Sequence, residues 1–281
     1  MGNRHLVISD IHENHEAIMR LILKARKIPG GFCDIWFLGD FFGHSEDADG
    51  KNHLTQNCLL TIEDLFQLPL YCVFGNWEYW LAHPENDEVN DGQRGNSNAL
   101  GERREILKRT KTHLLQRLMR YSILELPETR PEFTLFHGCS FSCHDTAAYH
   151  ADPWESYINP HDLNIVTRNL FGNADHLKTP HFLFGHTHIP GFFVYSKTSF
   201  VNMWRIFSPE MARTPIYYGN ENQRFGINPG SAGITQMNFP RTAIILDTKE
   251  KTFQYIVDHG DPMRINRNFF LTSLSMRNRQ R

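Results

Sequence analysis

Residues 5–12 read HLVISDIH, a short apolar run that ends in an aspartate and a histidine. The β-branched and aliphatic residues at 5–9 predict a buried strand. Apolar residues at helical spacing over 15–28 predict a helix, and residues 33–39, CDIWFLG, predict a second buried strand that ends in Asp40. A strand, a helix and a second strand in this order are typical of parallel pairing in an α/β domain.

The same alternation continues through the next part of the chain. Residues 54–68 predict a second helix, and residues 68–75, LPLYCVFG, predict a third strand that ends in Asn76. Residues 84–98 are polar and predict a loop or insertion, whereas residues 101–121 predict a helix with a basic face. A solvated helix face is the ordinary interpretation of these basic residues, and a surface that attracts an anionic substrate or partner is the alternative.

The second half predicts short strands joined by tight turns, and therefore more antiparallel pairing. These strands are expected at 128–136, 179–184, 192–196, 242–248 and 252–258. No linker separates two domains, so residues 1–281 are predicted to form a single domain. This domain would carry a loop or helical insertion near 84–121 and a disordered basic tail at 274–281.

Composition favours a soluble globular protein. Of 281 residues, 40% are hydrophobic and 21% are charged, and the net charge of −2 argues against a general binder of nucleic acids or membrane surfaces. No apolar run reaches the roughly 20 residues that cross a bilayer, and the start does not resemble a signal peptide. The five cysteines show neither a disulfide framework nor a zinc pair, so we expect a reducing, cytoplasmic location. Homo-oligomerisation is left open.

Polar side chains follow five of the predicted strands. They are Asp10 and His12 in SDIH, Asp40 in LGD, Asn76 in FGN, His137 in FHG, and His186 with His188 in GHTH. Each alone is ordinary, as a helix cap, a turn residue or a packed histidine. Because ligands of open α/β sheets bind beyond the carboxyl ends of the strands, the whole set predicts one site.

Carboxylate, amide and imidazole donors suit borderline cations, and we expect Mn, with Fe, Zn, Ni or Co as alternatives. The set contains no cysteine, which argues against a structural zinc site. Seven donors suit two divalent ions about 3.5–4 Å apart, with one carboxylate bridging both. Such a pair holds a bridging water and clamps both oxygens of an in-line displacement, which is chemistry for a phosphoryl centre.

The motifs SDIH, GD, GNxE, HG and GHTH, in this order, resemble the calcineurin-like metallophosphoesterase superfamily. The resemblance runs from Leu6 to His188, and INPGS (227–231) followed by PRTAIIL (240–246) resembles its phosphodiesterase-like branch. It implies an α/β fold, a four-layer α/β/β/α sandwich of two mixed β-sheets. It also implies that Asp10, His12 and His188 hold one metal, that Asn76, His137 and His186 hold the other, and that Asp40 bridges them.

The sequence departs from this family at Trp77, where the motif commonly has a histidine that stabilises the transferring group or protonates the leaving oxygen. An indole N–H cannot titrate, and positioned proton transfer contributes about 10²–10⁴-fold to a rate. Trp77 and Trp80 could pack, stack on a flat substrate group, or block the site. His44 and His144 are predicted as replacement acids, and Arg241 as a substrate contact.

The leading hypothesis is a dinuclear metal-dependent phosphoesterase. In it a metal-bridging hydroxide attacks phosphorus in line, while Asn76 and the metals hold the phosphoryl oxygens of a phosphodiester or nucleotide-like substrate. The alternative is a metal-binding or scaffold protein on the same fold. A protein phosphatase is a third interpretation, although the loops after GD and GN lack the arginines on which such enzymes rely.

Overall fold

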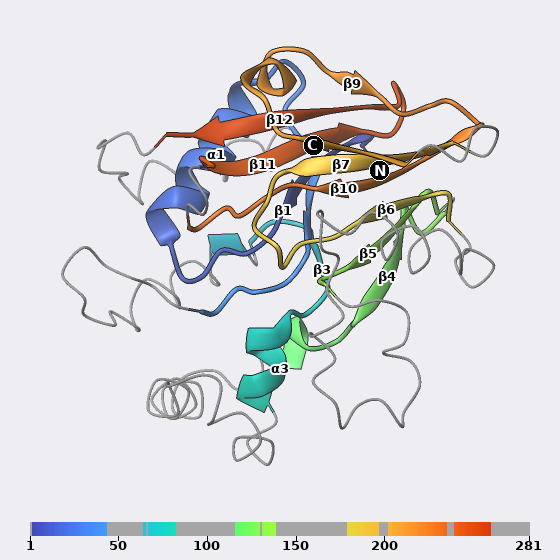
Figure 1. Ribbon diagram of the computed structural model, residues 1–281. Coiled ribbons are helices and arrows are strands. Elements are labelled where there is room, and N and C mark those ends of the chain that lie inside the picture. Colours follow the sequence, from blue (N-terminus) through green and yellow to red (C-terminus); the bar gives the residue numbers. More distant parts are fainter. Residues whose placement is uncertain are drawn as a thin grey trace.

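Two six-stranded sheets form the body of the protein (Figure 1). The computed structural model describes residues 2–43, 64–65, 67–82, 116–129, 131–138, 179–196, 202–234 and 239–259. Sheet A has the order β3-β2-β1-β11-β12-β9, and sheet B has the order β4-β5-β6-β10-β7-β8.

Sheet A contains β1 (Arg4–Ile8), β2 (Asp34–Phe37), β3 (Leu70–Cys72), β9 (Ile216–Tyr217), β11 (Arg241–Asp247) and β12 (Thr252–Asp258). Sheet B contains β4 (Ile123–Leu126), β5 (Phe133–Phe136), β6 (His181–Leu183), β7 (Gly191–Ser196), β8 (Asn202–Ile206) and β10 (Gln223–Asn228). A short 3₁₀ helix, η6 (Pro209–Ala212), precedes β9.

Both sheets are mixed, as predicted. In sheet A, β1, β2 and β3 are parallel to one another, whereas β1 pairs antiparallel with β11. In sheet B, β5, β6 and β10 are parallel, and β4, β7 and β8 are added by antiparallel pairs. The carboxyl ends of the parallel strands therefore lie together at one edge of each sheet.

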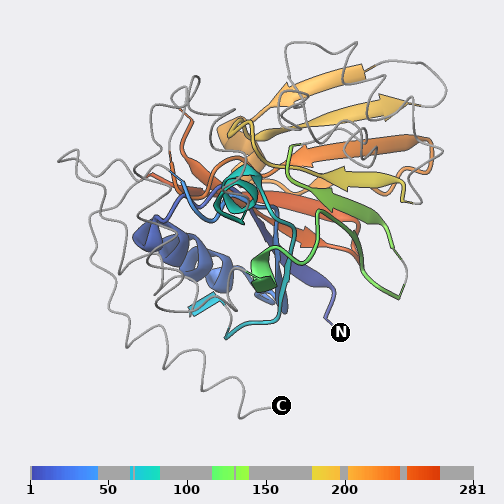
Figure 2. The ribbon, with the colours of Figure 1, turned by 90° about the horizontal axis from the view of Figure 1, so that it is seen from below.

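Helix α1 (His15–Lys27) covers the face of sheet A that is turned away from sheet B (Figure 2). The Asn14 side chain caps its first turn by accepting a hydrogen bond from Ala17 N at 3.1 Å. Its buried face carries Ile18, Leu21 and Ile22 at helical spacing. The predicted helix at 15–28 is thus present and meets the sheet through its apolar face.

The core follows the alternation of side chains along the strands. Leu6 and Ile8 of β1 pack with the apolar face of α1, whereas Val7 between them packs in the layer between the sheets, together with Trp36 and Tyr255. The outer face of sheet B carries a third cluster, Phe136, Phe182, Phe184 and Phe193. The helical layer predicted over that face falls outside the described residues.

The structure differs from the predicted elements after β3. The strand predicted at 68–75 is shorter, and the chain continues directly into α3 (Asn76–Ala82), which the sequence pattern did not predict. Strand β4 was also not predicted, and it starts at Ile123, directly after the stretch expected to be helical. The pattern left β8, β9 and β10 unassigned.

Several predictions fall wholly or largely on residues that the structure does not describe. The loop at 84–98 and the tail at 274–281 lie outside the described residues, as do most of the helices predicted at 54–68 and 101–121. Among the described residues, no helix has the length and apolar character needed to cross a membrane.

The carboxylate of Asp258, at the end of β12, ties α1 to sheet A. Its Oδ2 accepts a hydrogen bond from Arg20 Nε at 2.9 Å, and its Oδ1 accepts one from Lys24 Nζ at 3.0 Å. Asp258 is fully buried. Burial acts to raise its pKa, but the bonds from Arg20 and Lys24 outweigh this effect and hold the pKa of Asp258 below its ordinary value.

We expect Asp258→Asn to lower the free energy of unfolding at pH 7 by about 1.5–3 kcal/mol, the usual contribution of hydrogen bonds to charged groups. Because folding lowers the pKa of Asp258, its ionised form stabilises the fold above the ordinary aspartate pKa of about 3.9. That contribution disappears as the pH falls through the lowered value. Urea unfolding should therefore separate wild type from variant at pH 7 and bring them together in acid.

Glu250→Gln is the matched control, because the ion pair of Glu250 within the described part of the chain is with Lys249, and both side chains are mostly exposed. This control should unfold like the wild type at both pH values. Equal stability of the Asp258→Asn variant and the wild type at pH 7 would show that the charged carboxylate does not stabilise the contact between α1 and β12.

Candidate metal centre

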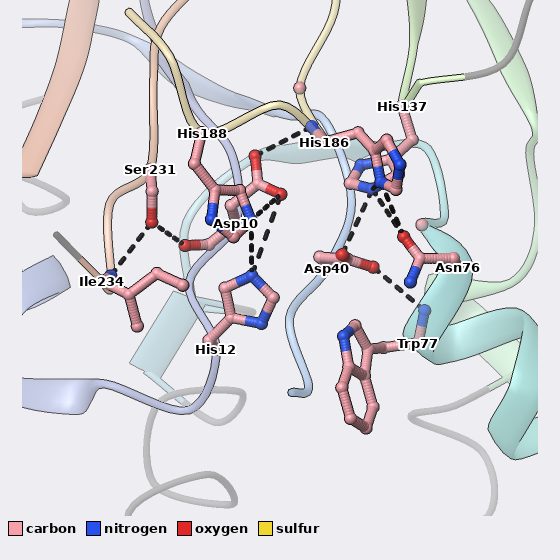
Figure 3. A network of polar contacts seen from close by, with 12 residues as sticks. Asp10, His12, Asp40, Asn76, Trp77, His137, His186, His188, Ser231 and Ile234 are labelled. Carbon is pink, nitrogen blue, oxygen red and sulfur yellow. Dashed lines mark hydrogen bonds and ion pairs between the residues drawn. The ribbon is translucent and has the colours of Figure 1, made fainter. Parts of the chain in front are cut away.

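The strand-end residues predicted as ligands converge on one place between the two sheets (Figure 3). From sheet A, Asp10 and His12 follow β1, Asp40 follows β2, and Asn76 opens α3 just after β3. From sheet B, His137 follows β5, and His186 with His188 lies between β6 and β7. They form two groups of donors, Asp10, His12 and His188 in one and Asp40, His137 and His186 in the other, and the donor atoms of each group lie within 4.8 Å of one another.

The first group joins the segment after β1 to the segment after β6. His188 Nε2 lies 3.2 Å from Asp10 Oδ1 and 3.0 Å from His12 Nε2. Burial acts to raise the pKa of Asp10, but His188 outweighs it and lowers the pKa. Burial lowers the pKa of His12 to about 4, so this imidazole is neutral at pH 7 and available as a ligand.

The second group is centred on His137. Its Nε2 lies 3.2 Å from Asp40 Oδ2 and 3.1 Å from Asn76 Oδ1, and His186 Nδ1 lies 2.9 Å from the same Asn76 oxygen. Burial and the neighbouring His137 lower the pKa of His186 to about 4. Burial also opposes a charge on His137, but Asp40 outweighs it and raises the pKa of His137 to about 9. The group therefore favours a positive charge at this point.

The hydrogen bonds of the second group show that a metal ion fits there. His137 Nδ1 donates to Leu38 O at 2.7 Å, which turns the lone pair of Nε2 towards the oxygens of Asp40 and Asn76. These three atoms need a cation among them, either the proton that the raised pKa of His137 reflects or a metal ion. In the first group, the buried Asp10 Oδ1 faces two imidazole nitrogens, His188 Nε2 at 3.2 Å and His12 Nε2 at 3.9 Å. Both donor sets suit a divalent cation.

The backbone at the predicted ligands is strained. Five of the seven have positive φ values, which are 54° at Asp10, 45° at His12, 57° at Asp40, 65° at His186 and 57° at His188. This left-handed region costs a residue other than glycine about 1 kcal/mol or more. Such conformations persist only where surrounding contacts hold them, here including Asp10 N to Gly39 O at 3.0 Å and Gly233 N to Asp10 O at 3.0 Å. Strain concentrated on the donors is typical of a functional site.

Glu78, in the first turn of α3, holds together the segments that follow β2 and β3. Its Oε2 accepts hydrogen bonds from Asp40 N at 2.9 Å and Gly75 N at 2.8 Å, and its Oε1 accepts from Phe41 N at 2.7 Å and Phe42 N at 3.1 Å. Burial and Asp40 raise the pKa of Glu78 to about 7, whereas the four N–H donors favour the carboxylate. Sequence reasoning gave this residue no role, although Glu78 stands three residues after Gly75, the spacing of a capping box.

Asp40 in turn caps α3, because its Oδ1 accepts a hydrogen bond from Trp77 N at 3.0 Å. The two segments approach closely through glycines. Gly39 has a φ of 95°, and a Cβ atom at Gly75 would collide with the Asp40 side chain. The Gly-Asp and Gly-Asn motifs are therefore two halves of one packed unit.

The NPGS loop at 228–231 bonds to the backbone at or next to donors of both sheets. Asn228 Nδ2 donates to Gly185 O at 3.0 Å, next to His186, and Ser231 Oγ donates to Asp10 O at 2.9 Å. The sequence singled out this loop as a branch motif only. The structure shows that this loop holds the backbone of Asp10, in the first donor group, and the backbone next to His186, in the second.

Trp77 lies close to the centre but is largely buried. Its side chain is 8% exposed, belongs to the core cluster between α1 and sheet A, and meets Trp80 edge-on with ring centroids 5.5 Å apart. This burial agrees with the packing interpretation, and a contact between Trp77 and substrate stays a prediction.

Arg241, another predicted site residue, makes its contacts away from this centre. Arg241 Nε donates to Gly233 O at 2.8 Å, and its guanidinium lies 3.9 Å from Asp258, so the side chain is engaged at the α1–β12 contact. Its predicted contact with substrate stays a prediction. His44 and His144, the predicted replacement acids, lie outside the described residues.

We expect Glu78→Gln to weaken metal binding by about 10–100-fold, the usual cost of losing a residue that orients metal ligands. The amide has the same size, but one of its atoms would present N–H groups to two backbone donors. Titration calorimetry with Mn²⁺ would measure the change.

Glu16→Gln on α1 is the control, because the Glu16 side chain is 62% exposed and, among the described residues, its ion pair is with Arg20. Wild-type metal affinity in the Glu78→Gln variant would show that the two segments hold their geometry without this carboxylate.

Comparison with known proteins assigns a family to this fold and centre. Residues 4–251 match the family model of the calcineurin-like phosphoesterase superfamily domain. The crystal structure of a metallophosphoesterase from Sphaerobacter thermophilus has a similar fold, with a TM-score of 0.56 and 18% identity over 98% of this chain and 94% of that one.

Two further solved structures are more distant matches. Yfce, a phosphoesterase from E. coli, matches with a TM-score of 0.40 and 14% identity over 90% of this chain and 98% of its own. A cold-active protein-tyrosine phosphatase of a psychrophilic Shewanella species matches with a TM-score of 0.45 and 13% identity over 91% and 80%. The search of curated proteins returned no match. On the family match over most of its length, the chain belongs to the calcineurin-like phosphoesterase superfamily.

Proposed function

We propose that the protein is a dinuclear metal-dependent phosphoesterase that hydrolyses a phosphodiester or a nucleotide-like compound. Its family indicates metal-dependent hydrolysis of phosphoric esters. The observation that carries the finer proposal is the convergence of donors from five strand ends of two sheets (Figure 3). Six of them form two groups of three, and Asn76 joins the second group through His137 and His186.

The two groups match the two ions of the proposal. Asp10, His12 and His188 would hold one ion, and Asn76, His137 and His186 would hold the other, with Asp40 shared. When bound, such a pair of ions polarises the phosphoryl oxygens and lowers the pKa of the attacking water. Mn²⁺ is the proposed metal, and Fe, Zn, Ni or Co ions suit the same donors.

The chain's own residues supply orientation rather than proton transfer at this centre. Leu38 O fixes the ring of His137, and Glu78 fixes the segment that carries Asp40. Asn76 offers a neutral oxygen, which leaves the second group with a single carboxylate. This arrangement holds the donors in place before substrate arrives, so little reorganisation accompanies the reaction.

The identity of residue 77 supports the substrate class. The family's usual histidine is replaced by Trp77, which cannot give a proton to a leaving oxygen. Esters whose leaving group departs readily are then favoured over simple monoesters of poor leaving groups. The proposed proton donors for other substrates are His44 and His144. Trp77 and Arg241 are proposed to contact substrate only where it extends beyond the metal ligands.

Metal removal tests the function directly. Chelation should abolish hydrolysis of bis-p-nitrophenyl phosphate, added Mn²⁺ should restore it, and metal analysis should return at least two ions per chain. His137→Ala removes a ligand and should lower kcat/KM by about 100-fold or more, beyond the usual effect of residues outside the ligand set.

Failure to cleave this diester and a panel of nucleotides, with both ions bound, would refute the proposal. Fewer than one ion per chain after reconstitution would instead favour the scaffold alternative.

A second experiment addresses the leaving group. Trp77→His should raise the ratio of monoesterase to diesterase activity, by up to about 10²-fold, because an imidazole at this position can donate a proton. Trp80→His is the control, since Trp80 contacts Trp77 from the next turn of α3. Melting temperatures of both variants would separate a loss of packing from a change in chemistry. An unchanged ratio in a folded Trp77→His variant would show that residue 77 acts in packing alone.

A further inference from the structure

A second cluster of metal-ligating side chains lies at the opposite end of β1 and β2. It consists of His5, Cys33 and Asp34, whose donor atoms all lie within 4.8 Å of one another. The parallel register of the two strands places His5 directly beside Asp34. His5 is 3% exposed and Asp34 is 7% exposed. Asp10 and Asp40 follow the other ends of these strands, so the cluster is separate from the phosphoesterase centre.

The distances within the cluster are close to those around a metal ion. Cys33 Sγ lies 3.8 Å from His5 Nδ1, and two ligands at tetrahedral zinc, one sulfur and one nitrogen, lie about 3.5 Å apart. His5 Nδ1 lies 2.6 Å from Asp34 Oδ1, and a nitrogen and an oxygen on the same ion lie about 3.3 Å apart. A shift of less than about 1 Å would therefore admit the ion.

The hydrogen bonds of Thr248 decide how His5 presents its ring. Thr248 Oγ1 donates its proton to Asn3 O at 3.1 Å, which leaves this oxygen as an acceptor facing His5 Nε2 at 3.4 Å. A metal ion at Nδ1 is compatible with this arrangement, because Nε2–H can then donate to Thr248 Oγ1. Stacking on Trp36, with ring centroids 4.2 Å apart, holds the ring in this position. His5 Nδ1 and Asp34 Oδ1 lie 2.6 Å apart and share a hydrogen that a metal ion would displace.

The charges around the cluster favour a divalent cation. Within the described part of the chain, no lysine or arginine forms an ion pair with Asp34, and the neighbouring Arg4 is engaged by Asp247 at 2.7 Å. Burial and Asp34 raise the pKa of the Cys33 thiol to about 11, so a bound ion must displace the thiol hydrogen, which Cys33 Sγ donates to Arg4 O at 2.9 Å. A thiolate and a carboxylate together balance the charge of one divalent ion, and its binding would release the thiol proton.

A cavity of about 240 Å³ adjoins the cluster. His5 and Asp34 line it together with Trp36, Tyr71, Glu128 and Thr248. The indole N–H of Trp36 is buried and has no acceptor among the described residues. The open side of the cluster therefore faces a space that can hold a water molecule as a further ligand.

We propose that His5 Nδ1, Cys33 Sγ and the Asp34 carboxylate bind a zinc-class divalent ion, with water from the cavity as the fourth ligand. Thiolate and imidazole ligands favour such a borderline ion over Mg²⁺ or Ca²⁺. Its role is structural: it joins the starts of β1 and β2. The inference stands independently of the proposed function, since no cysteine belongs to the phosphoesterase ligand set.

Cobalt spectroscopy tests this site without interference from the other one. Metal-free full-length protein, kept reduced, would be titrated with Co²⁺. A thiolate-to-cobalt charge-transfer band in the near ultraviolet is expected, because only a sulfur ligand produces it. Cys33→Ser should remove the band and reduce bound metal by one ion per chain. Cys72→Ser is the matched control, since Cys72 is the other free cysteine of the described residues and should leave the band unchanged.

Asp34→Asn provides a second variant that keeps the cysteine. It should weaken Co²⁺ binding at this site by about 10-fold or more and shift the charge-transfer band. Absence of the band in folded wild-type protein that binds Co²⁺ at the phosphoesterase centre would overturn the proposal. It would show that His5 and Asp34 are held by a proton alone.

Discussion

The buried carboxylate of Glu78 is the contact on which the centre depends. It accepts N–H groups from the segments that follow β2 and β3, and so joins the backbone of the two. A single amide donor bonded to a charged group contributes about 1.5–3 kcal/mol, and Glu78 collects four from backbone that would otherwise be buried without partners. With those segments joined, Asp40 reaches the start of α3 and the oxygen of Asn76 reaches His137.

The left-handed backbone of the donors depends on a second set of contacts. At Asp10 and His12 the chain leaves the extended geometry of β1 through positive φ values, and both side chains meet His188 of the other sheet. The NPGS loop and the backbone after β2 provide the hydrogen bonds that hold this turn. The sheets therefore fix where the donor residues lie, and the strained loops after the strands fix the directions of their side chains.

Much of this arrangement could be predicted from sequence, because strand ends and donor types are both local properties. The apolar run at 5–9, followed by Asp10, predicts a strand and a ligand at once. The order of five such endings identifies the family. Helix α3 was missed because its cap comes from Asp40, 37 residues away, and no local pattern contains that contact. For Glu78 the capping-box spacing indicates only the bond to Gly75, because its other partners are backbone amides of residues 40–42, which carry no sequence signal.

The cluster of His5, Cys33 and Asp34 shows another limit of predicting metal sites from sequence motifs. Zinc sites are recognised in sequences by cysteines and histidines at short spacing. His5 and Cys33 are 28 residues apart, and they meet only because β1 and β2 pair in parallel with His5 beside Asp34. Arg241 is the opposite case. Its place in a sequence motif suggests a contact with substrate, whereas its side chain bonds to Gly233 and faces Asp258.

The donors of the phosphoesterase centre come from both sheets, and this placement has a consequence for the lifetime of the protein. An ion held by Asp10 of one sheet and His188 of the other would act as a reversible cross-link across the sandwich. Binding to the folded chain alone stabilises it by RT ln(1 + [M]/Kd), about 2.7 kcal/mol when free metal exceeds Kd by about 100-fold. Metal supply in the cell then sets how much of the chain survives unfolding and degradation, as well as how fast each surviving molecule works.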